Sequence, residues 1–157
     1  MTAEPVLVSH SPLESYVDRF AGAGRDDTVR LRELPFLPMA EVRGTTEAPD
    51  ASALRLGPDW WLVVGPAGEA EPGVDVSAQR TTLELRGWRA RDVLMTGCPL
   101  DLDALGVGAT AQTLLGQAQV ILHRTAPDAW RVLVRASFAR YLADWLLDAM
   151  VEHGEGT

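Results

Sequence analysis

Two amino-acid types are absent from this chain. It has no lysine and no asparagine, so all 14 of its basic residues are arginine. Without lysine there is no Schiff-base residue and no Walker-type phosphate loop, and without asparagine there is no Cys-His-Asn catalytic site. Cysteine occurs once, as Cys98. A single cysteine excludes an internal disulfide and a Cys-x-x-Cys metal pair, and it is typical of a reducing, cytoplasmic location.

Long apolar runs are also missing. No run approaches the ~20 residues that span a bilayer, and residues 1–5 lack the basic start and apolar continuation of a secretory signal. We therefore expect no membrane association. The net charge is −8, with 22 acidic residues against 14 basic ones. An acidic chain with scattered arginines lacks the basic patch of a nucleic-acid-binding protein, so nucleic acid is not an expected partner.

The composition is that of a folded chain with an apolar core. The 157 residues, 46 % of them hydrophobic, suit a single domain over residues 1–157 with an ordered core at about 11–152. A chain of this length buries about 70 % of its extended surface, so its fold requires no metal and no disulfide.

Short apolar or alternating segments, separated by glycine, proline and polar residues, predict β-strands. They lie at residues 29–32, 40–44, 54–56, 60–64, 74–76, 81–85, 110–115, 120–122 and 130–134. The Gly57-Pro-Asp59 turn predicts a hairpin, and the last three strands suit a meander. Because helices are interspersed among strands joined by short turns, the sequence predicts an α+β domain with a mainly antiparallel sheet.

Apolar residues at three-and-four spacing predict two short helices in the first hundred residues. The first covers about residues 11–20, with Ser11 as its N-cap and Val17 on its apolar face. The second follows Gly87 and ends at Gly97, which is placed at the C′ position.

The last predicted helix begins after Ser137 as its N-cap and ends near Gly154. Arg140 and Asp144 are spaced for an ion pair on its surface. Its apolar stripe predicts a buried face and consists of Phe138, Tyr141, Leu142, Trp145, Leu146, Ala149 and Met150.

Histidine and cysteine provide no catalytic pattern. His10, His123 and His153 are far apart and none has a partner at metal-ligand spacing, so we interpret His123 as a strand-end side chain. Cys98 follows a helix instead of preceding one, where its thiol pKa would be lowered. It is therefore expected to be a small buried hydrophobic residue.

Acidic residues and glycines provide no catalytic or cofactor-binding pattern either. Asp101 and Asp103 share a face of an extended segment, but the other ligands of a calcium loop are missing, and Asp101 is expected to cap a turn. The pairs Gly22-x-Gly24 and Gly106-x-Gly108 do not continue into a dinucleotide-binding motif. The sequence predicts no catalytic, cofactor-binding or metal-binding residue.

Tryptophan is frequent, with five residues in the chain. Trp60 and Trp61 are adjacent on a predicted strand, so their side chains point to opposite faces and one of them needs a cover. Large aromatic side chains are enriched at the centres of protein interfaces. Trp60, Trp61 and Trp145 are therefore the candidate interface residues, with burial by the chain's own helices as the open alternative.

Six motifs occur in order along the chain: Ser11-Pro12-Leu13, Leu56-Gly-Pro-Asp-Trp-Trp-Leu-Val-Val64, Asp75-Val-Ser-Ala-Gln-Arg-Thr81, Gly97-Cys-Pro-Leu-Asp-Leu102, Ala111-Gln-Thr-Leu-Leu115 and Phe138-Ala-Arg-Tyr-Leu-Ala-Asp-Trp-Leu-Leu147. Together, over about residues 11–150, they resemble the gamma subunit family of heterotetrameric sarcosine oxidase. The family is similar in fold to the folate-binding domain of the glycine-cleavage T-protein.

The resemblance implies a non-catalytic subunit with alpha, beta and delta partners. The complex would convert sarcosine to glycine, forming hydrogen peroxide and methylenetetrahydrofolate. The family's FAD, FMN, NAD and tetrahydrofolate belong to the larger subunits and its zinc to the delta subunit. The connector at residues 65–73 is shorter than the helical insertion expected there.

Two alternatives remain open on the sequence. The chain could serve an oxidase for another N-methyl amino acid, because the substrate is selected in another subunit. It could instead be a free-standing folate-binding or aminomethyltransferase-like protein, for which Asp75 is the candidate pterin-binding carboxylate.

Overall fold

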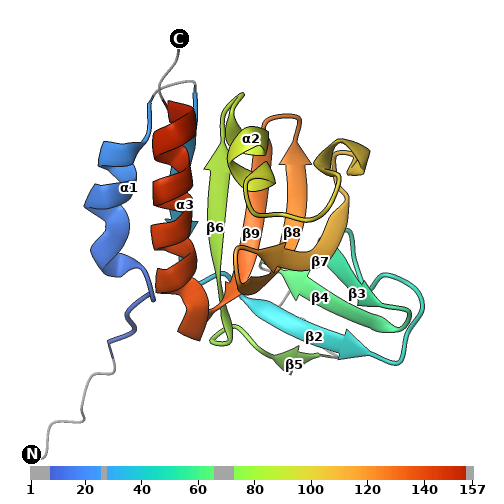
Figure 1. The fold of residues 1–157 in the computed structure, drawn as a ribbon. Coiled ribbons are helices and arrows are strands. Elements are labelled where there is room, and N and C mark those ends of the chain that lie inside the picture. The colour runs from blue at the N-terminus through green and yellow to red at the C-terminus, as the bar shows by residue number, and fades with distance from the viewer. Residues whose placement is uncertain (1–7, 26–27, 66–72, 155–157) are drawn as a thin grey trace, which may run out of the picture.

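The structure is a computed structural model that describes residues 8–25, 28–65 and 73–154. A five-stranded sheet carries helices on one face, and a smaller, four-stranded sheet packs against part of its other face (Figure 1). Every strand pair within the two sheets is antiparallel. The prediction of an α+β fold with mainly antiparallel sheet is confirmed.

The larger sheet has the strand order β1-β6-β9-β8-β7. In that order the strands are Arg30–Leu34, Arg80–Arg86, Ala129–Arg135, Ala118–Ala126 and Thr110–Leu115. The predicted meander is confirmed, since β7, β8 and β9 pair consecutively through short turns.

The smaller sheet has the order β3-β4-β2-β5. In that order the strands are Ala53–Gly57, Trp60–Val64, Met39–Arg43 and Val74–Asp75. The predicted hairpin is formed by β3 and β4, with a register shift at Arg55 and Gly57. Most of the connector at residues 65–73, where the family resemblance implies a longer helical insertion, lies outside the described residues.

The described residues form three α-helices, which flank the larger sheet. They are α1 (Val17–Ala23), α2 (Ala90–Met95) and α3 (Ala139–Gly154). Short 3-10 turns precede α1 at Glu14–Tyr16 and α3 at Ala136–Phe138, and another lies at Leu102–Ala104. Within the described ranges, no helix is both long and apolar enough to cross a membrane.

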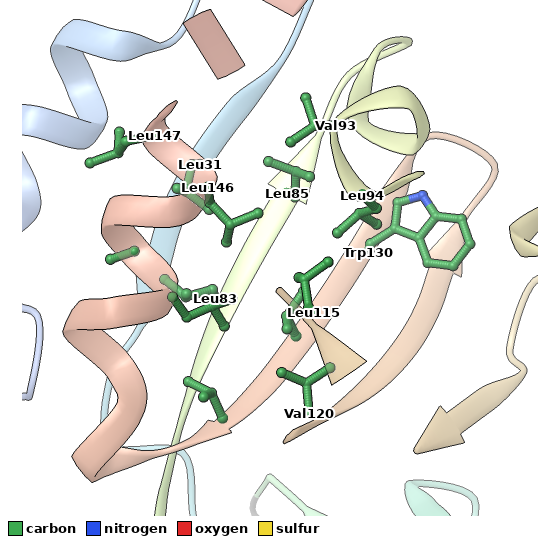
Figure 2. Packing of buried hydrophobic residues seen from close by; sticks show 14 of the residues in the cluster. Leu31, Leu83, Leu85, Val93, Leu94, Leu115, Val120, Trp130, Leu146 and Leu147 are labelled. Carbon is green, nitrogen blue, oxygen red and sulfur yellow. The ribbon is translucent and has the colours of Figure 1, made fainter. Parts of the chain in front are cut away.

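The main core lies between the larger sheet and the three helices. Leu83 and Leu85 of β6 point to the same face because side chains alternate along a strand, and both are fully buried. Figure 2 shows Leu85 between Leu146 of α3 and Leu94 of α2, and Leu83 further along β6 beside α3. Trp130 of β9 is fully buried in this cluster.

A second cluster lies between the two sheets. Ile121 and Leu133 from β8 and β9 pack there against Met39, Leu54 and Leu62 of the smaller sheet. The smaller sheet covers only part of the larger one. Further along the same face, the larger sheet carries Glu84 with arginine neighbours instead of a second apolar layer.

The predicted start of the first helix is wrong. The Ser11 hydroxyl donates to Glu33 Oε2 at 2.6 Å instead of capping a helix, and α1 begins only at Val17. The intervening 3-10 turn changes the angular phase of the side chains, because it has 3.0 residues per turn instead of 3.6. As a result Tyr16 and Phe20 are buried, whereas Val17 is 61 % exposed.

Two predictions about the last helix are also wrong. Ser137 lies inside a 3-10 turn and is not an N-cap. Asp144 accepts hydrogen bonds from Arg19 at 2.8 Å and from Tyr16 at 3.2 Å, where an ion pair with Arg140 was expected. These bonds join α3 to the α1 segment, a partner 125 residues away that spacing along one helix cannot predict.

Candidate functional site

The titratable residues do not assemble into a metal centre. Among residues 8–25, 28–65 and 73–154, no group of three or more His, Cys, Asp or Glu side chains could hold a metal ion. His10 Nδ1 lies 2.6 Å from Glu14 at the exposed start of the chain. The expectation that this chain holds no cofactor stays a prediction.

His123 lies within β8 and not at a strand end, which corrects the sequence interpretation. It pairs with Arg131 of β9 and Thr110 of β7. Burial, and next the charge of Arg131, lower the pKa of His123. Both effects favour the neutral imidazole. Among the described residues, no carboxylate accepts a hydrogen bond from His123 that would orient the ring as a catalytic base.

Cys98 lies in the main core and is 8 % exposed, as the sequence predicts. Its backbone N–H donates to the carbonyl of Leu94 at 3.0 Å, which closes the end of α2. A thiol packed in this way is a core side chain and not an accessible nucleophile.

Asp101 and Asp103 have separate structural roles. Asp101 Oδ1 accepts from the backbone N–H of Asp103 at 3.0 Å, so it caps the 3-10 turn as predicted. Asp103 forms a two-pronged ion pair with Arg91. The hydrogen bond from Arg91 holds the pKa of Asp103 below its usual value. The carboxylates of Asp101 and Asp103 are therefore both bonded to other groups of the chain, and together they do not form a cation site.

Asp75, the candidate pterin-binding carboxylate, is exposed on β5. Its Oδ1 accepts from the Ser77 hydroxyl at 2.6 Å and from the Ser77 backbone N–H at 2.9 Å. These bonds lower the pKa of Asp75. Because the carboxylate closes a local turn at an exposed edge, the described geometry does not favour folate binding there.

Trp60 and Trp61 point to opposite faces of β4, as predicted. Trp61 is only 7 % exposed, and its indole N–H donates to the carbonyl of Thr45 at 2.9 Å. Trp60 is half-buried beside the inter-sheet cluster, and the guanidinium of Arg43 lies 4.2 Å from the centre of its ring. The chain covers most of Trp61 by itself, so Trp60 retains more surface for a partner.

Trp145 of α3 packs tightly against the turns beneath the helix. A Cβ at Gly97 would lie 2.4 Å from Trp145 Cζ2, and the Gly116 N–H donates to the carbonyl of Gly97 at 3.1 Å. Gly97 is not in the left-handed conformation expected of a C′ glycine. Its function is to let Trp145 approach, so most of this tryptophan serves the fold.

The sequence analysis missed the most exposed aromatic side chains. Trp88 is 55 % exposed, Phe36 61 % and Phe138 48 %. Phe36 and Trp88 lie in turns, where strand and helix periodicity do not predict burial. Phe138 and Tyr141 were predicted to lie on the buried stripe of the last helix, and both predictions are wrong. Phe138 lies in the 3-10 turn before α3, and Tyr141 is 39 % exposed, with its hydroxyl accepting from the backbone N–H of Gln117. Phe36 also has a φ of 58°, and it is the only non-glycine residue with positive φ in the described part of the chain.

The fold matches a known class. The aminomethyltransferase T of the glycine cleavage system from Bartonella henselae superimposes with a TM-score of 0.59 at 16 % identity, over 82 % of this chain and 48 % of that one. At this identity the likeness shows the fold alone. The protein is thus an α+β chain whose fold is similar to that of the T-protein.

The family follows from closer relatives. The sequence profile of the "sarcosine oxidase, gamma subunit family" matches residues 70–152. The sarcosine oxidase subunit gamma of Corynebacterium sp. (strain P-1) is 33 % identical over 189 aligned positions, covering 95 % of this chain and 93 % of the relative. That of an Arthrobacter species is 38 % identical over 76 % of this chain and 65 % of the relative. This chain belongs to the sarcosine oxidase gamma subunit family.

A solved structure agrees with this assignment. A chain of the heterotetrameric sarcosine oxidase from Corynebacterium sp. U-96 superimposes with a TM-score of 0.84 at 30 % identity, over 95 % of this chain and 98 % of that chain. The alignment with the strain P-1 relative is longer than this chain's 157 residues. That relative therefore carries segments that this chain lacks.

Proposed function

We propose that this chain is the gamma subunit of a heterotetrameric sarcosine oxidase and contributes no catalytic group to it. The observation that carries the proposal is the superposition on a chain of such a complex, with a TM-score of 0.84 over nearly the whole of both chains. The local bonding of Asp75 and Asp103 supports a structural role, since both carboxylates are already engaged by neighbouring groups of the chain.

The proposed complex removes the N-methyl group of sarcosine. Sarcosine, tetrahydrofolate and oxygen yield glycine, methylenetetrahydrofolate and hydrogen peroxide. FAD, FMN, NAD and tetrahydrofolate are bound by the alpha and beta subunits, and zinc by the delta subunit. An oxidase for another N-methyl amino acid would use the same gamma scaffold, because the substrate pocket lies in another chain.

Co-expression with the three partner genes tests this assignment. We expect the chain to co-elute with a flavin-containing complex in gel filtration, and to be colourless and without oxidase activity when purified alone. Absorbance at flavin wavelengths and peroxide formation from sarcosine are the measurements. Bound flavin on the lone chain, or a chain that never co-elutes with the partners, would reject the proposal.

Phe36 is the exposed side chain that we propose as a docking residue, in addition to Trp60 and Trp145. A bulky residue in the left-handed region costs about 1–2 kcal/mol, and such strain is found where function requires a particular side-chain placement. Phe36 borders a hollow with Pro12, Ala136 and Arg80, so its ring lies beside a concave surface.

Phe36→Asn separates docking from folding. Asparagine tolerates the left-handed conformation, so we expect the free energy of unfolding to rise by about 0.5–1 kcal/mol. Association with the partner subunits should weaken about thirtyfold, the loss typical of an interface hot spot. Val107→Asn, at another exposed apolar residue without positive φ, is the control and should change neither quantity. Unchanged association of Phe36→Asn would show that this residue is not in the interface.

A further inference from the structure

Two residues that line the same groove each have a buried hydrogen-bond donor without a partner. Arg80 Nη1 and Trp60 Nε1 are both buried and have no hydrogen-bond acceptor among the described residues. Both residues line a hollow of about 370 Å³ between β4 and the face of the larger sheet that bears Ile121 and Leu133. Because a buried donor left unpaired costs free energy, two of them at one hollow indicate a missing acceptor.

The charge of this groove is unusual for the inside of a protein. Arg80 is directly opposite Arg135 in the β6–β9 ladder, and like charges in that position repel. The Arg80 side chain is 10 % exposed, and its nearest carboxylate, Glu41, is 3.8 Å away, beyond hydrogen-bond distance. Burial first, and then the charge of Arg135, lower the pKa of Arg80, and the charge of Glu41 offsets them only in part. Arg43, stacked on Trp60, adds another positive charge nearby.

The remaining lining shows which kind of anion would fit. Gln119 and Thr113 provide polar groups at the rim, whereas Leu114, Ile121 and Leu133 form an apolar wall. Gln112 is already used, since its amide donates to the carbonyl of Leu56 at 2.5 Å. The planar guanidinium fork matches a planar carboxylate, and the apolar wall suits the carbon chain attached to it.

We propose that this groove is a carboxylate-binding site in which Arg80 and Trp60 donate to the carboxylate and Arg135 neutralises its charge. The carboxylate comes either from a small organic acid or from an acidic side chain of a partner subunit. The second source rests on the proposed function, whereas the first does not.

Binding to the isolated full-length chain tests the first source. Propionate is titrated at constant ionic strength, with tryptophan fluorescence and the thermal unfolding midpoint as readouts, and neutral propionamide is the matched control. We expect saturable binding of propionate alone. Arg80→Gln should weaken it at least tenfold and the exposed Arg135→Gln several-fold, whereas Arg140→Gln, an arginine on α3, should leave it unchanged. Because Arg135→Gln alters an exposed side chain, it keeps the test informative if Arg80→Gln fails to fold.

Co-purification with the partner subunits tests the second source. If propionate does not bind, we expect Arg80→Gln and Arg135→Gln to reduce co-elution with the complex at least tenfold, while Arg140→Gln co-elutes like the wild-type chain. A wild-type chain that fails to co-elute would count against the proposed function and leave propionate binding as the test of the groove. Neither propionate binding nor an Arg80-dependent loss of co-elution, with the wild-type chain assembling normally, overturns the proposal.

Discussion

Gly87→Ala is expected to lower the free energy of unfolding by about 3–5 kcal/mol, because it combines backbone strain with a steric overlap. Gly87 has a φ of +128°, and a Cβ there would lie 2.3 Å from the carbonyl oxygen of Thr28 and 2.8 Å from the Cα of Val29. These are backbone atoms, so no side-chain rotation relieves the overlap. The Gly87 N–H also donates to the carbonyl of Asp128, which ties β6 to the β8–β9 turn.

Gly108→Ala is the matched control for this prediction. Gly108 also has a positive φ, of +88°, but nothing lies within 4 Å of the added Cβ. Gly108→Ala should therefore lower the free energy of unfolding by the backbone strain alone, about 1–2 kcal/mol. Urea denaturation of both variants measures the difference. Equal losses for the two glycines would mean that the segment containing Thr28 moves aside, contrary to the packing described above.

Trp130→Ala should be similarly costly, with a loss of about 3–5 kcal/mol in the free energy of unfolding. Trp130 is fully buried on β9, where Figure 2 shows its ring beside Leu94 of α2. Truncation removes the largest fully buried side chain of the core and leaves a cavity that the packed strands cannot close.

Trp88→Ala is the control, because Trp88 is 55 % exposed at the turn that leads into α2. Its removal should change the free energy of unfolding by no more than about 0.5 kcal/mol. Chemical denaturation with both variants distinguishes the two tryptophans. A loss below about 1 kcal/mol for Trp130→Ala would contradict a close-packed core at this position.

The proposed function gives these stability measurements a further use. A subunit without catalytic groups acts through its shape and surface, so core variants such as Trp130→Ala should lose assembly only as far as they lose folding. Phe36→Asn should lose assembly while gaining stability. The comparison separates a surface contribution from a general loss of structure.

Strand and helix periodicity predicted most elements of the fold but not their ends. The alternation at Val29 and Leu31 predicted β1, and the apolar run at residues 60–64 predicted β4. Both predictions succeeded because the spacing of apolar residues along a strand follows from which of its faces are buried. Helix starts were wrong at Ser11 and Ser137. In both cases a 3-10 turn comes first, and a serine that resembles a cap takes another role or none.

Site residues were predictable where their partners are near in the sequence. Asp101 was expected to cap a turn, and it does so through the backbone of Asp103. Arg80 could not have been singled out, because the groove that it lines also needs Trp60 and Arg135, which come from two other strands. The same holds for Phe36, since a left-handed backbone at phenylalanine is set by the chain around it.

By itself, the sequence determined the class of fold, the strands of the meander and the family resemblance, and it indicated no catalytic group. These follow from local periodicity, composition and ordered motifs, which are properties of neighbouring residues. Only the tertiary structure decided which tryptophans are covered, which carboxylates are engaged and where an arginine nitrogen is buried without a hydrogen-bond acceptor. Those outcomes depend on contacts between residues far apart along the chain, because burial and charge compensation are properties of the packed molecule.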